Sequence, residues 1–121
     1  MPADFALDIY NEQRHVDLKK LREAIGADQI EFATIAEMAV ATVKANRGSV
    51  GTDKKVKNLV YALKLLAPLC KNDPNRIRAW FTDPKVFWGG LTPLEMFSMK
   101  KSKGVIETLE SYTDGEAAVG S

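Results

Sequence analysis

Cysteine and histidine are almost absent from this chain of 121 residues, which contains one of each. The single cysteine, Cys70, excludes a disulfide within the chain, and it lies in an apolar stretch typical of a small buried residue. The single histidine, His15, has no cysteine or carboxylate at the spacing of metal ligands. The sequence therefore predicts no metal site, and a Ser-His-Asp or Cys-His catalytic arrangement is not indicated.

Long apolar runs are also lacking. None approaches the roughly 20 residues that a membrane-spanning helix needs, and the first residues, MPADFALDIYNEQRH, have neither a basic leader nor a continuous apolar segment. We therefore expect a cytoplasmic protein with no membrane partner. No glycine-rich loop follows a strand-like segment, so the sequence predicts no nucleotide cofactor and a protein that is not an enzyme.

Positive and negative charges nearly cancel, with 17 lysines and arginines against 16 acidic residues. The net charge of +1 gives the whole chain no general affinity for nucleic acid or for acidic membranes. The positive charge is nevertheless concentrated, because the stretch from Thr42 to Lys64 has six basic residues against Asp53 alone. This local excess is the one electrostatic feature that calls for a function.

Apolar residues recur every three to four positions along most of the chain, and no useful period-two alternation occurs. This pattern predicts an all-α, compact helical bundle without a sheet. Residues 4–14 form a short amphipathic arm with Phe5 and Ile9 on one side. Capping residues predict helices that begin after Asp17, Asp28 and Asp73.

Two further helices are expected from their buried stripes. The longest helix is predicted to begin at Thr52 and to end or kink at Pro68. The last is predicted near residues 100–113, with four residues facing inward: Val105, Ile106, Leu109 and Tyr112.

Residues 28–47 can be arranged as a helix-turn-helix. Ala33 is the small residue where the two helices cross, Val43 anchors the second helix, and Glu37 occupies the turn position where glycine is common. The candidate DNA-binding residues are Thr42, Lys44, Arg47, Lys54, Lys55 and Lys57. A plain helical bundle with a solvated basic face remains the alternative.

Residues 80–97, WFTDPKVFWGGLTPLEMF, are unusually rich in aromatic and turn-forming residues. Gly89 and Gly90 permit a tight turn beside Trp88, and Thr92, followed by Pro93 and Glu95, has the pattern of a capping box. The segment predicts a rigid aromatic corner between two short helices, suited to packing or to docking a partner.

Residues 74–115 resemble the toxin-binding domain of the Xre/MbcA/ParS antitoxin family. The resemblance rests on an Arg-Ala-Trp-Phe run at 78–81, Pro84, the Gly-Gly pair at 89–90, Thr-Pro-Leu-Glu at 92–95, and an apolar last helix closing at Gly115. Residues 28–47 also fall where that family has its Xre-like helix-turn-helix.

The resemblance implies an antitoxin with four parts. They are an N-terminal arm (1–16), a helix-turn-helix-like region (17–70), a toxin-binding helical domain (71–115) and a flexible tail (116–121). The implied partner is a RES-domain toxin, whose fold is similar to ADP-ribosyltransferases and which uses NAD or modifies a metabolic enzyme. Such antitoxins commonly form a homodimer, and many bind their own operator DNA.

Family members neutralise the toxin by covering its active-site cleft with their C-terminal region. On this basis the candidate toxin-binding residues are Phe87, Trp88, Tyr112, Glu116 and Ser121, where Glu116 and the terminal carboxylate would meet arginines of the cleft. The alternative is a stand-alone Xre-like DNA-binding transcriptional regulator whose C-terminal region serves for dimerisation.

Overall fold

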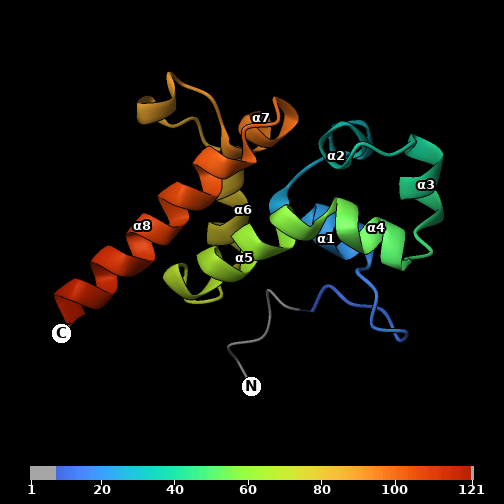
Figure 1. The fold of residues 1–121 in the computed structure, drawn as a ribbon, viewed down its shortest axis with the longest axis horizontal. Helices are drawn as coiled ribbons and strands as arrows, with labels where there is room; N and C mark the ends of the chain where they lie inside the picture. Colours follow the sequence, from blue (N-terminus) through green and yellow to red (C-terminus); the bar gives the residue numbers. More distant parts are fainter. Residues whose placement is uncertain (1–7, 121) are drawn as a thin grey trace.

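The computed structural model describes residues 8–120, and the surroundings of side chains from residue 8 to residue 113. Within this range the chain forms eight α-helices and no strand, which confirms the all-α prediction (Figure 1). The helices are α1 (Leu18–Ile25), α2 (Gln29–Ala36), α3 (Val40–Ala45), α4 (Val50–Lys55), α5 (Lys57–Leu69), α6 (Pro74–Thr82), α7 (Pro93–Ser98) and α8 (Ser102–Gly120), with a 3₁₀ turn, η2 (Val86–Trp88), before α7.

The described residues share one hydrophobic core. The most extensive packing is between α5 and α8 and between α1 and α6, and α2 also packs against α7. Phe32 of α2, Leu63 of α5, Phe81 of α6 and Leu109 of α8 are all fully buried in this core. The regions 17–70 and 71–115 therefore share a single interior, since helices of each supply side chains to it.

The predicted helix starts are confirmed in detail. The carboxylates of Asp17, Asp28 and Asp73 accept hydrogen bonds from backbone N–H groups in the first turns of α1, α2 and α6, at 3.0, 2.7 and 2.9 Å. At α7, Thr92 and Glu95 form the reciprocal capping box, with distances of 3.0 and 2.8 Å. These caps could be predicted because they depend only on residues two or three positions apart.

The long helix expected from Thr52 begins earlier than predicted and is interrupted in its interior, whereas its predicted end at Pro68 lies one residue from the observed end at Leu69. Ser49 caps α4 in a capping box with Thr52, so the helix begins at Val50. The buried Val56 then interrupts it, with φ −104° and ψ 8°, and α5 follows from Lys57. Pro68 lies inside the last turn of α5. The longest helix is instead α8, with 19 residues.

The end of α8 also differs from the expectation. The helix extends to Gly120, well beyond residue 113 and through most of the predicted tail 116–121. Val105 and Leu109 are buried as predicted, but Ile106 is only half-buried and Tyr112 is 41% exposed. Tyr112 is exposed because the helix has by then passed beyond the core, and Figure 1 shows its C-terminal end extending past the other helices.

The described part of the arm, residues 8–16, is a tight turn rather than a helix. Ile9 is buried, as the sequence predicts, and Tyr10 and Val16 pair as an antiparallel bridge. The backbone N–H of Val16 donates to Asp53 Oδ1 at 2.9 Å, and His15 Nδ1 lies 2.7 Å from Asp53 Oδ2. These contacts fasten the arm to α4. Residues 1–7, which include Phe5, lie outside the described residues.

Asp17 joins two helices as well as capping one. Its Oδ1 accepts from Asn46 Nδ2 at 2.8 Å, while Asn46 Oδ1 accepts from the backbone N–H of Leu18 at 2.6 Å. The pair connects the beginning of α1 to the end of α3. Burial acts to raise the pKa of Asp17, but the hydrogen bonds from Lys20 and Asn46 outweigh it and lower the pKa below 3.8.

Replacing Asp17 with alanine is therefore expected to lower the free energy of unfolding by about 1–2 kcal/mol at neutral pH. A group whose pKa is lowered by folding stabilises the protein above its unfolded-state pKa, and this contribution is lost as the pH falls through the folded-state value. The loss caused by D17A should thus diminish in acid. Urea unfolding of D17A across pH measures it, with D17N, which keeps the cap without the charge, as the control. Equal stability of D17A and the unaltered chain at neutral pH would contradict this role.

Candidate functional site

The aromatic corner, defined as residues 80–92, is held by ring contacts. Trp80 meets Phe81 edge to face at a centroid distance of 5.4 Å, and Trp88 meets Trp80 in the same manner at 6.2 Å. Phe87 packs on Trp88 at 5.1 Å. Lys85 Nζ lies 4.9 Å from the centre of the Trp80 ring, and burial lowers the pKa of this lysine. Trp80 is half-buried against the core, so it supports the corner from below.

The backbone of the corner closes on itself. Lys85 N–H donates to the Leu91 carbonyl at 3.0 Å, and Gly90 N–H donates to the Lys85 carbonyl at 2.9 Å. Gly89 and Gly90 have φ of 67° and 89°, and a Cβ added at either would meet no atom within 4 Å. The glycines are thus needed for their backbone conformation rather than for space, as the sequence predicts.

The tip of the corner is apolar and exposed. Val86 is 93% exposed and Phe87 is 58% exposed, whereas Trp88 is half-buried beneath them. Figure 1 shows this turn standing away from the helices, beyond α7. Of the two predicted toxin-binding aromatics in the corner, Phe87 is therefore exposed and Trp88 mainly supports it. Val86 was not singled out from the sequence, although it lies beside Phe87.

The remaining candidate toxin-binding residues lie on α8 or beyond it. Tyr112 is on the outer surface of the helix, ten residues after its beginning and therefore about 15 Å along it. The side chain of Glu116 and the whole of Ser121 lie outside the described residues. The corner and the end of α8 are thus two separate features of the C-terminal half.

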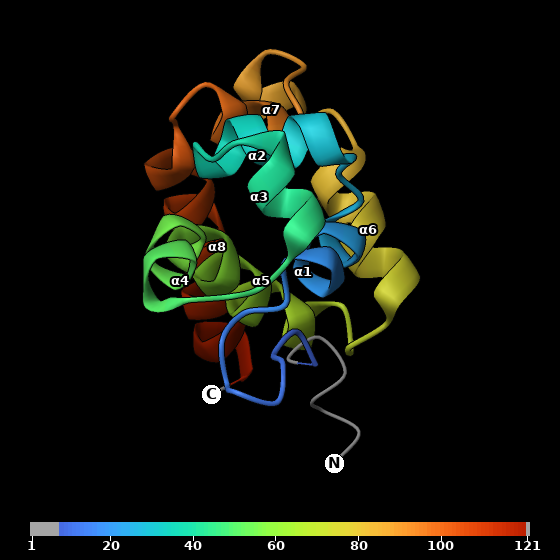
Figure 2. The same ribbon diagram turned by 90° about the vertical axis from the view of Figure 1, so that its right-hand side faces the viewer.

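Within residues 28–47, α2 and α3 pack against each other and are joined by a short turn at residues 37–39. Ala33 and Val43 are buried where α2 and α3 meet, and Glu37 ends α2 with φ 55° and ψ 49°. This is the left-handed conformation that glycine adopts without strain, and it costs another residue about 1 kcal/mol or more. Figure 2 shows α3 at the front of the molecule, below α2 and beside α1.

Two lysines stabilise the strained turn. Lys55 Nζ donates to the Glu37 carbonyl at 2.8 Å. Lys100, from the α7–α8 connection, donates to the Thr34 carbonyl at 2.9 Å and lies 3.3 Å from Glu37 Oε2. Both lysines therefore bind the negative end of α2. Lys55, a candidate DNA-binding residue, thus makes a structural contact with the end of α2.

The other candidate DNA-binding residues are exposed but fall into separate hollows. Thr42 and Arg47 line a shallow hollow of about 340 Å³ between α3 and the start of α4. Lys44 lines another, of about 270 Å³, on the side of α3 that faces α1. Lys54 and Lys57 line a third hollow, with the arm. The candidate DNA-binding residues therefore lie on more than one surface of the protein.

Sequence reasoning missed the two basic residues of α1 that adjoin Lys44. Lys19 and Arg22 line the same hollow as Lys44, together with Gln29 at the start of α2. Arg22 Nη1 donates to the Ala27 carbonyl at 3.3 Å, and its buried Nε has no partner among the described residues. The buried stripe of Leu18, Leu21 and Ile25 was the available signal, because it places Lys19 on the exposed side of α1 and Arg22 at the edge of the stripe.

Comparison with known proteins leaves the family open: no protein-family model matches the chain, and no curated protein shows significant similarity to it. Among the described residues, no group of three histidine, cysteine or carboxylate side chains is close enough to hold a metal ion. Within the same range, no helix has both the length and the apolar character needed to cross a membrane.

Proposed function

We propose that this protein is a cytoplasmic antitoxin that binds a cognate RES-domain toxin and blocks its active-site cleft. The observation that carries the proposal is the apolar tip of the aromatic corner, where Val86 and Phe87 project from a stiff support. Exposed apolar side chains on rigid elements are typical anchors of protein interfaces, because they lose little entropy on binding. The tip falls within residues 74–115, which resemble the toxin-binding domain.

The projecting end of α8 is suited to the blocking step. From Ser111 to Thr113 its described side chains are exposed, and the helix continues to Gly120. A segment that is already helical needs less ordering on binding than a flexible tail would, so more of its contact energy contributes to affinity. In this mechanism the corner anchors the toxin and the end of α8 enters the cleft.

The helix-turn-helix favours a second function, binding of operator DNA by a homodimer. Thr42 and Lys44 are exposed on α3 on either side of the buried Val43, and Lys19 extends the basic surface. A protein that only regulates transcription, with a C-terminal dimerisation region, would use the same surface and would leave the aromatic corner for self-association.

Co-expression with the neighbouring reading frame tests the main proposal. If that frame encodes a RES-domain protein, its expression alone should stop growth, and co-expression with this chain should restore growth and yield a purified complex. Soluble expression of both proteins without a complex, or without protection, would refute the antitoxin function. Dimerisation through the corner without any toxin complex would favour the regulator.

Deleting residues 113–121 should abolish protection from the toxin while leaving the fold intact. The deletion removes the end of α8 but keeps Val105 and Leu109, which are buried in the core. Growth assays measure protection and thermal unfolding measures stability, with a deletion of residues 119–121 as the control. Full protection by the chain lacking 113–121 would show that α8 does not block the cleft.

A further inference from the structure

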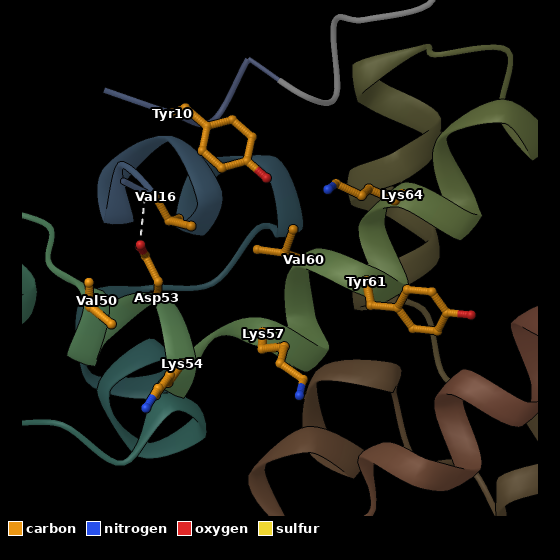
Figure 3. A pocket seen from close by; sticks show the side chains of 9 residues that line it. All are labelled: Tyr10, Val16, Val50, Asp53, Lys54, Lys57, Val60, Tyr61 and Lys64. Atoms are coloured by element: carbon orange, nitrogen blue, oxygen red, sulfur yellow. Dashed lines mark hydrogen bonds between the residues drawn. The ribbon is translucent and has the colours of Figure 1, made fainter. Parts of the chain in front are cut away.

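A hollow lies between the arm and helices α4 and α5 (Figure 3). Its volume is about 450 Å³, within the range of about 300–1,000 Å³ typical of small-molecule sites. Neither the aromatic corner nor the exposed face of α3 contributes to it. Its lining residues are Tyr10, Val16, Val50, Asp53, Lys54, Lys57, Val60, Tyr61 and Lys64.

The walls of this hollow are fixed by the fold. On the arm side, Ile9 and Val16 are buried, and Asp17 N–H donates to the Ile9 carbonyl at 2.6 Å. On the helix side, Val60 is buried in α5 and Tyr61 donates to Glu110 Oε2 of α8 at 2.8 Å. The hollow therefore exists before any ligand arrives, which reduces the ordering cost of binding.

The surface of the hollow is mainly apolar. Val16 and Val60 form its base, and the ring of Tyr10 stands over it in Figure 3. Val50, at the first position of α4, is 64% exposed at the edge. A flat ring or a short acyl chain would remove this apolar surface from water, which is favourable in proportion to the area covered.

The charge at the hollow is positive. Lys54, Lys57 and Lys64 are exposed around it, and within residues 8–113 no carboxylate forms an ion pair with any of them. The one acidic lining residue, Asp53, has one oxygen against His15 and the other bonded to Val16 N–H. Lys64 Nζ lies 6.0 Å from the Tyr10 ring centre, so it is directed across the hollow. One ammonium group directed across an apolar base, with two further lysines at the edge, matches an amphipathic anion.

We propose that this hollow binds a small amphipathic anion, an aromatic ring or short acyl chain that bears a carboxylate or phosphate. The apolar part lies against Val16, Val60 and Tyr10, and the anionic group lies beside Lys64, with Lys57 adding positive charge at the edge of the hollow. A second copy of the chain fits less well, because a symmetric contact would place these lysines against their own equivalents.

The test uses the fluorescent dye anilinonaphthalene sulfonate, which combines aromatic rings with an anionic group. The purified full chain should bind it, and K57Q/K64Q should weaken binding about five- to tenfold, since each lost charge-assisted contact at an exposed site has a modest effect. V50E, which adds an exposed carboxylate at the edge, should weaken binding similarly. The matched control K101Q/K103Q removes two exposed lysines elsewhere and should leave binding unchanged.

Competition distinguishes the two forms of the ligand. Octanoate and phenyl phosphate are added separately to the dye complex, and displacement by either supports the site and indicates which anionic group it prefers. Equal dye binding by the unaltered chain and K57Q/K64Q would overturn the proposal. Displacement by duplex DNA but by neither small anion would also overturn it, because the lysines would then serve nucleic acid.

Discussion

The variant V86D/F87D is expected to bind the proposed toxin at least about 30-fold more weakly than the unaltered chain, because loss of an interface anchor costs about 2 kcal/mol or more. Each substitution also places a charged group where an apolar surface should be covered. Both residues are mainly exposed in the free protein, so the temperature of unfolding should not change. Isothermal titration with purified toxin measures the affinity.

The control for this experiment is I30D. Ile30 is 71% exposed and apolar like the tip, but it lies on α2. An aspartate in the first turn of a helix is tolerated because it faces the positive end of the helix dipole. Toxin affinity should be unchanged in I30D. If V86D/F87D bound as tightly as I30D, the corner would not be the anchor, and the proposed function would lose its main support.

The variant K19Q/K44Q should bind operator DNA at least about tenfold more weakly at moderate salt, because two phosphate contacts are lost. The slope of log K against log salt concentration should become shallower by nearly two, since each contact contributes about 0.9. Lys19 and Lys44 are exposed and line one hollow beside α3, so the substitutions should leave the fold unchanged.

A gel-shift series across salt concentrations measures both quantities, with K101Q/K103Q as the control that removes the same charge from α8 and the connection before it. A uniform weakening in both variants would mean that only net charge matters. In that case α3 would not be the element that contacts DNA.

The sequence predicted the features that depend on neighbouring residues. Asp17, Asp28 and Asp73 begin helices, the Thr92–Glu95 pair forms its capping box, and Glu37 occupies a turn with positive φ. In each case the chemistry lies within about one helical turn, so reading along the chain was sufficient.

The errors arose where distant parts of the chain decide the structure. The interruption at Val56 is invisible in the apolar periodicity, because Val56 is itself buried and continues the pattern. The exposure of Tyr112 depends on where the core ends, which no local pattern reports. The hollow beside α5 is lined by residues of the arm and by residues of α4 and α5 that are 34–54 positions away, so only the folded chain could reveal it.

The single interior has a consequence for how this protein can be altered. Helix α5 packs on α8, and Lys100 donates a hydrogen bond to the Thr34 carbonyl near the end of α2. The regions 17–70 and 71–115 therefore cannot be exchanged as independent modules. A chimera that joined residues 17–70 to the C-terminal region of another protein would bring together helix surfaces that do not pack well on each other. We expect such a chimera to be insoluble. Recombination within this gene should be tolerated only where α5, α8 and Lys100 come from the same parent.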